Sequence, residues 1–174
     1  GLAWITILRK RETMRAAFDD FDPDIVAAYG EPEIERLLND PGIIRSRAKI
    51  QAAIDGARIW VEMRDNGEDF SAWLWSFVDD EVIHTPFSEF REAPTQTDAS
   101  AAMSKALKAR GFKFVGPVIT YAWMQAVGLV DDHAAGCFRR KQASEGPPAG
   151  RDLSLHPAVW GCAHRASAAC DEPT

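Results

Sequence analysis

The sequence predicts an all-α fold, and three observations lead to that expectation. Apolar residues recur three and four positions apart, the spacing of one helix face, and no segment shows the sustained alternation of a half-buried strand. Proline and glycine separate the periodic segments, as expected for turns between helices. A chain of 174 residues with 46% hydrophobic content is long enough for one domain with a sizeable core.

The first predicted helices lie in the N-terminal half. One covers residues 25–29, where Asp22 is placed to cap the helix and Pro23 to occupy its first turn. Two short amphipathic helices follow, with a turn at residues 39–42 because proline and glycine prevent continuation there. The apolar positions that define this pair are Ile34, Leu37, Leu38, Ile43, Ile44, Ile50 and Ile54.

Three further helices are predicted in the second half. Residues 70–78 form a short aromatic segment, whose tryptophans we expect in the core. Thr97 begins a helix that runs to about Ala109, and Pro117 lies in the first turn of another that continues through Gln125. The last two helices are therefore joined by a turn at residues 110–116.

Beyond Cys137 the composition changes. Residues 138–174 are rich in Ala, Pro, Gly, Ser and Arg and show no periodicity, so we expect a domain at 1–137 and a disordered tail at 138–174. Cys162, His164 and Cys170 could be metal ligands, but they lack paired ligand spacing, and a segment without a metal role is favoured.

Composition says more about the cellular compartment of the protein than about its function. Three cysteines without disulfide-like spacing, and no apparent signal peptide at this N-terminus, favour a reducing cytoplasmic setting. No apolar run approaches the length needed to span a bilayer. The net charge of −6 argues mildly against nucleic acid, but the cations are clustered, and phosphate binding requires only a local basic patch.

The turn at residues 110–116 is the strongest candidate for such a patch. Gly111 and Gly116 permit positive φ and close approach to a phosphate, while Lys108, Arg110 and Lys113 supply positive charge. A second basic group, Arg45, Arg47 and Lys49, follows the other glycine turn. The alternative for each group is the solvated face of a helix, and the sequence pattern alone leaves it open.

His133 and Cys137, four positions apart, are residue types that bind zinc. Two ligands are half of a tetrahedral site. We therefore expect this chain alone to bind zinc weakly or not at all.

Several segments together resemble the 3-methyladenine DNA glycosylase I family, a divergent branch of the helix-hairpin-helix glycosylases. They keep the family's order and spacing and lie at residues 1–12, 21–23, 42–50, 75–78 and 107–137. The resemblance implies a helix-hairpin-helix fold, with residues 110–116 as the hairpin and the turn at residues 40–44 as its structural relative.

The resemblance also implies a function in base excision repair. The expected reaction is hydrolysis of the N-glycosidic bond of 3-methyladenine in alkylated double-stranded DNA by a monomeric, monofunctional glycosylase. In the family pattern Trp4 is the residue that stacks on the flipped base, and Leu2 belongs to the loop that fills the gap left behind. The complete family protein also holds zinc, for which His133 and Cys137 are the matching ligands in this chain.

The remaining family residues have no counterpart in residues 1–137. The base-recognising Glu, an aromatic pocket partner and two further zinc ligands would lie upstream of residue 1, so no catalytic acid or base is assigned, and we expect a fragment with little activity of its own. Asp131 stands where the family usually has Asn. A general base is conceivable there, but an N-cap or solvated carboxylate is favoured. The alternative functions are a non-catalytic hairpin module that binds DNA and a plain structural or interaction protein.

Overall fold

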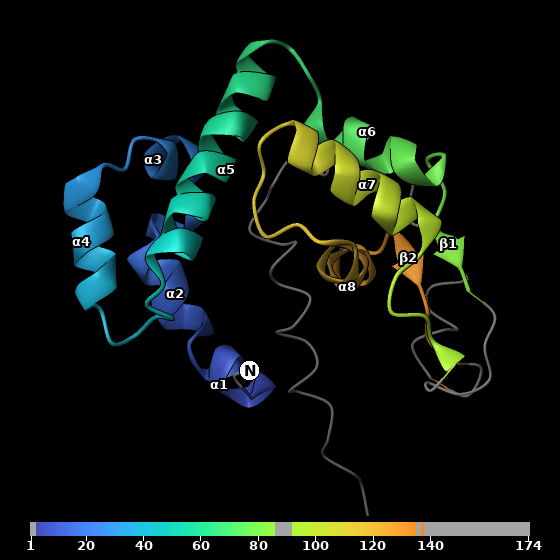
Figure 1. Cartoon of the computed structure of the whole chain (residues 1–174), viewed down its shortest axis with the longest axis horizontal. Coiled ribbons are helices and arrows are strands. Elements are labelled where there is room, and N and C mark those ends of the chain that lie inside the picture. The colour runs from blue at the N-terminus through green and yellow to red at the C-terminus, as the bar shows by residue number, and fades with distance from the viewer. Residues whose placement is uncertain (1–2, 86–91, 135–136, 138–174) are drawn as a thin grey trace, which may run out of the picture.

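The computed structural model describes residues 3–85, 92–134 and 137, and it confirms the all-α fold (Figure 1). The N-terminal half contains α1 (Trp4–Arg9), α2 (Arg11–Ala17), the short 3-10 helix η1 (Asp19–Phe21), α3 (Pro23–Ala27), α4 (Glu31–Asn39) and α5 (Arg47–Asp65). The C-terminal half contains α6 (Phe70–Trp75), the 3-10 helix η2 (Ser76–Val78), α7 (Asp98–Ala109) and α8 (Pro117–Val127).

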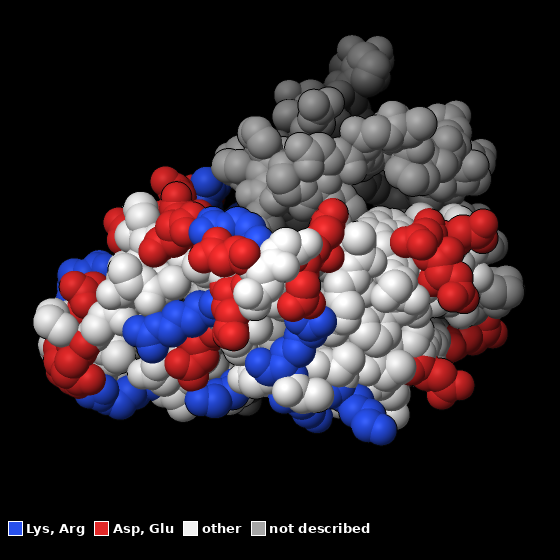
Figure 2. All heavy atoms as spheres, turned by 90° about the horizontal axis from the view of Figure 1, so that it is seen from above, with Lys and Arg blue, Asp and Glu red and all other residues white. Residues whose placement is uncertain are grey.

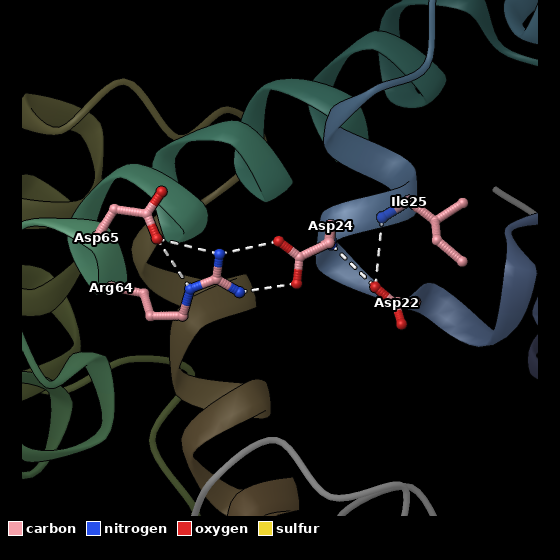
Figure 3. A network of polar contacts seen from close by, with 5 residues as sticks. All are labelled: Asp22, Asp24, Ile25, Arg64 and Asp65. Atoms are coloured by element: carbon pink, nitrogen blue, oxygen red, sulfur yellow. Dashed lines mark hydrogen bonds and ion pairs between the residues drawn. The ribbon is translucent and has the colours of Figure 1, made fainter.

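The cap predicted for α3 is confirmed. One Asp22 carboxylate oxygen accepts hydrogen bonds from the N–H groups of Asp24 at 2.9 Å and Ile25 at 3.3 Å, and Pro23 occupies the first turn (Figure 3). The Asp24 carboxylate accepts hydrogen bonds from Arg64 Nη1 at 2.7 Å and Nη2 at 2.8 Å, and these side-chain hydrogen bonds lower the pKa of Asp24. The pair fastens α3 to the C-terminal end of α5.

The helix pair after α3 differs in length from the prediction. The second member, α5, is 19 residues long rather than short, and it begins at Arg47, so Ile43 and Ile44 lie in the turn before it. Ile43 is nonetheless buried, and it packs into the core from the turn. The helix extends past Ile54 because buried Met63 continues its apolar face and no proline interrupts it.

The helices predicted for the C-terminal half are present. Thr97 and Ser100 form a capping box at the start of α7, Pro117 occupies the first turn of α8, and Gly128 ends α8 in a left-handed conformation. The tryptophans of α6, Trp73 and Trp75, pack against the core but are only partly buried. The buried positions of this segment are Leu74 and Val78.

A two-stranded parallel sheet was not predicted. Ile83 pairs with Val130 and His84 with Asp131, forming β1 (Ile83–His84) and β2 (Val130–Asp131). Strands of two residues are too short to show an alternating pattern in the sequence. The pairing places His84 beside Asp131.

The helices enclose two apolar cores. The first lies among α2, η1, α3, α4 and α5, and the second among α6, η2, α7, α8 and the sheet. In Figure 1, α5 runs between the N-terminal helices and the C-terminal ones. No helix in the described ranges is both long and apolar enough to cross a membrane.

Candidate nucleic-acid interface

The hairpin between α7 and α8 depends on Gly111. Its φ is +98°, and its N–H donates to the Lys108 carbonyl at 3.0 Å, while the Phe112 N–H donates to the Leu107 carbonyl at 3.1 Å. This is the pattern of a helix that ends on a left-handed glycine. A Cβ at Gly111 would lie 3.3 Å from Ile59 Cδ1, so the residue also permits close packing on α5.

Gly116 behaves differently from the expectation. Its φ is −64°, so positive φ does not require glycine here, and a Cβ would meet no protein atom within 4 Å, while close approach to a phosphate stays a prediction. It is the N-cap of α8. The other residue of the hairpin with a positive φ is Phe114, at 58°, whose side chain is half exposed.

The hairpin offers a run of backbone donors. Within the described part of the chain, the N–H groups of residues 113–116 have no hydrogen-bond acceptor, and Pro117 has no N–H. Successive free N–H groups at the start of a helix are suited to bind a phosphate oxygen, because they point outward and the helix dipole adds partial positive charge. The sequence could not show this, since it depends on which carbonyls the fold brings near.

Of the three cations predicted for the hairpin, two form ion pairs with described residues and one does not. Lys108 is exposed and forms no ion pair with the described residues. Arg110 contacts Glu68 Oε2 at 2.7 Å and lies over the Trp73 ring, 4.4 Å from its centre, so it fastens the hairpin to the start of α6. Arg110 is therefore paired with a carboxylate, and so is Lys113.

Lys113 Nζ contacts Asp55 Oδ2 on α5 at 2.8 Å. This hydrogen bond, together with one that Gln51 donates, lowers the pKa of Asp55 below its usual value. The Lys113 side chain is still 58% exposed, so it remains accessible to a ligand.

The second glycine turn is held by α2. Thr13 Oγ1 donates to the Gly42 carbonyl at 2.6 Å, Lys10 Nζ donates to the Pro41 carbonyl at 2.5 Å, and the Gly42 N–H donates to Asp40 Oδ1 at 2.6 Å. This turn joins two helices as the hairpin does, and its close contacts fix the start of α5 against α2.

The candidate zinc ligands lie together. His133 Nδ1 and Cys137 Sγ are 3.6 Å apart. Two ligands of a tetrahedral zinc ion, one sulfur at about 2.3 Å and one nitrogen at about 2.05 Å, would be separated by roughly 3.6 Å. The observed spacing therefore fits half of such a site. No group of three or more possible ligands occurs in the described ranges, and Cys162, His164 and Cys170 lie outside them.

Asp131 is not solvated, so that part of the favoured interpretation was wrong; its role as a helix N-cap stays a prediction, because residues 135–136 lie outside the described ones. It is 8% exposed, since β2 is covered by the second core. Its Oδ1 accepts the His133 N–H at 3.1 Å, and its Oδ2 lies 3.3 Å from His84 Nδ1. The side chain therefore orients the backbone that carries His133.

The residues expected to contact the flipped base are only partly described. Trp4 is the first residue of α1, while Leu2 lies outside the described residues. The α1 helix exposes Ile5 and Leu8. On α8, the exposed apolar side chains are Val118, Ile119 and Trp123, which the sequence analysis did not single out.

These features define a class: a helical protein whose glycine-ended hairpin presents cations and free N–H groups, as proteins that bind a nucleic-acid backbone do. The model of the family described as methyladenine glycosylase matches residues 1–140. The chain belongs to the methyladenine glycosylase family, which confirms the resemblance recognised in its sequence.

Individual relatives agree with this assignment. The chain is 56% identical over 137 residues to DNA-3-methyladenine glycosylase 1 of Escherichia coli, covering 79% of this chain and 73% of that protein. A crystal structure of 3-methyladenine DNA glycosylase I superposes with a TM-score of 0.76 at 55% identity, covering 79% of this chain and 76% of that one. A variant of 3-methyladenine DNA glycosylase I in complex with 3-methyladenine superposes at 0.74 with 36% identity, covering 79% and 74%.

Proposed function

We propose that this protein is a monofunctional DNA glycosylase that releases 3-methyladenine from alkylated double-stranded DNA, acting as a monomer in base excision repair. The observation that carries the proposal is the family match over residues 1–140, together with relatives named for this activity. The hairpin supports it because free N–H groups and an unpaired Lys108 suit a phosphate backbone.

The reaction requires little chemical assistance from the protein. Methylation at N3 leaves the adenine cationic, so when the bond between C1′ and N9 breaks, the base takes the electron pair and leaves as neutral 3-methyladenine. Water adds its oxygen to C1′ and releases a proton, which leaves an abasic site. The protein can then contribute mainly by binding the flipped cationic base more tightly than a normal one.

In this proposal the described residues bind the DNA backbone and hold the hairpin in place. The hairpin holds the backbone through N–H groups 113–116, Lys108 and the exposed part of Lys113. Arg110 and Gly111 also position the hairpin: Arg110 fastens it to the start of α6, and Gly111 lets it pack closely on α5. Stacking on the base is assigned to Trp4 by its family position.

The test is base release from methylated duplex DNA, measured by mass spectrometry. It uses the 174-residue chain and a chimera that carries, ahead of Gly1, the N-terminal segment of the Escherichia coli relative. We expect the chimera to release 3-methyladenine and the chain alone to release little. No release by a folded chimera that binds DNA would overturn the proposed activity and favour the alternative of a non-catalytic hairpin module.

We also infer that His133 and Cys137 supply two ligands of a structural zinc ion in the complete protein. The 3.6 Å separation of their nitrogen and sulfur atoms supports this, as does the hydrogen bond from the His133 N–H to Asp131, which fixes the backbone. Bound zinc would tie chain segments together. Zinc content of the purified chimera is the readout: Cys137→Ser should remove the metal, and unchanged zinc in that variant would refute the assignment.

A further inference from the structure

A surface groove separates the first turns of α5 from the hairpin. One wall carries Lys49, Ala52 and Ala53, and the other carries Lys113, Phe114 and Ile119. The two walls come from segments far apart in the sequence, which Gly56 and Phe112 hold close: a Cβ at Gly56 would lie 3.5 Å from the Phe112 ring.

Lys49 gives the groove a positive charge that the protein does not neutralise. Its side chain is exposed and forms no ion pair with the described residues. By contrast, Arg47, two positions before it, binds Glu31 and also contacts Glu35 at 2.9 Å. Asp55, one turn beyond the groove wall, is already paired with Lys113. The charge left for a ligand is therefore that of Lys49.

Lys49 differs from the other unpaired lysines by its place, since Lys105 and Lys108 also form no ion pair with the described residues but do not line the groove. The net charge is −6, and on the face shown in Figure 2 Asp and Glu are interleaved with Lys and Arg over much of the surface. Most described arginines have a carboxylate or carbonyl partner, including Arg15, Arg47, Arg58, Arg64 and Arg110. Lys49 and Lys113 line the same groove, so two positive charges can act there on one anion.

The remaining side chains indicate what kind of anion. Ala52 and Ala53 are small and leave room on the α5 wall. The exposed apolar side chains of Phe114 and Ile119 suit a ligand that has apolar as well as charged parts. A phosphodiester backbone has this character, because its charged phosphates alternate with apolar deoxyribose faces. The groove is also continuous with the hairpin, since Lys113 and Phe114 belong to both.

We propose that this groove binds the backbone of the same DNA strand that the hairpin contacts, with Lys49 as the phosphate contact. The inference rests on the proposed function, and it adds a second point of attachment on α5. Two attachments, one on each of the two cores that α5 connects, would fix the direction of the strand across the protein as well as its position.

The experiment compares Lys49→Gln with Lys105→Gln. Lys105 is an exposed lysine on α7 that does not line the groove, so its substitution removes the same charge elsewhere. Affinity of the full chain for a short labelled duplex is measured by fluorescence anisotropy over a range of salt concentrations. Each lost phosphate contact should flatten the log–log salt dependence by about one unit, and at 0.1 M salt it should weaken binding roughly fivefold to tenfold.

We expect that change for Lys49→Gln and an unchanged slope for Lys105→Gln. Ala52→Glu, which adds bulk and negative charge to the groove wall, should weaken binding further, while thermal unfolding reports that each variant is folded. If Lys49→Gln keeps the wild-type slope and affinity, the groove does not bind the DNA backbone, and the role of the hairpin in DNA binding is not affected. Equal losses in both lysine variants would also overturn the proposed groove, because the effect would then be one of net charge. No duplex binding by the wild type would overturn the inference and the proposed function together.

Discussion

Gly111→Ala should destabilise the protein, whereas Gly116→Ala should not, although both glycines bound the same hairpin. Alanine at Gly111 must adopt a φ near +98°, and its Cβ would lie 3.3 Å from Ile59 Cδ1. A left-handed backbone costs about 1–2 kcal/mol for a residue with a Cβ, and the end of a flexible isoleucine can yield at small further cost. At Gly116, φ is −64° and the space is open, and the poorer N-cap that alanine makes is offset by the lower conformational entropy of the unfolded chain, so the net change should stay within about a few tenths of a kcal/mol.

Thermal and urea unfolding followed by circular dichroism can measure both variants. A loss of about 1–2 kcal/mol corresponds to a decrease in Tm of roughly 2–8 °C for a protein of this size. Gly111→Ala should also weaken binding to duplex DNA, because the free N–H groups follow directly after this turn. Wild-type stability in Gly111→Ala, or equal losses in the two variants, would refute the argument that backbone conformation distinguishes these glycines.

Three further predictions concern single side chains. Asp55→Asn should strengthen duplex binding and steepen its salt dependence, because Lys113 is released from its 2.8 Å ion pair; weaker binding in that variant would contradict this. Burial, with the hydrogen bond to Asp19, raises the pKa of Tyr29 to about 12, so its contribution to stability should be present below about pH 10 and fall as the pH rises towards 12. Tyrosinate absorbance in wild type and Tyr29→Phe checks it, and ionisation of Tyr29 near pH 10 would count against it. Trp4→Ala in the chimera should lower 3-methyladenine release roughly tenfold to a hundredfold while binding to undamaged duplex stays near wild type, and parallel losses of both would refute the stacking role.

Local chemistry made much of the fold predictable. Asp22 with Pro23, Thr97 and Pro117 mark helix starts through interactions with residues at most a few positions away, and each start is confirmed. The length of α5 was misjudged because the glycine in its middle obscures a helix that is stabilised by packing on α3, α4 and α6. The family assignment rested on whole segments of sequence, and it is confirmed as well.

The site was predictable only at the level of residue identity. Lys113 and Asp55 are separated by 58 positions, so no local pattern shows that the lysine is already paired. Asp131 is buried because β2 pairs with β1, a contact between two-residue strands that the sequence does not signal. The groove likewise arises from the approach of α5 to the hairpin, and Phe114 and Ile119 gain their significance there.

Base release from DNA is the most direct test of the central claim that this protein is a 3-methyladenine glycosylase. Duplex DNA treated with a methylating agent is incubated with the chimera, and the free bases are separated and quantified by mass spectrometry. The account predicts that 3-methyladenine is released well above the rate of spontaneous loss, that unmodified adenine is not, and that Trp4→Ala lowers the release. Release no faster than in the absence of protein, or equal release of unmodified adenine, would contradict it.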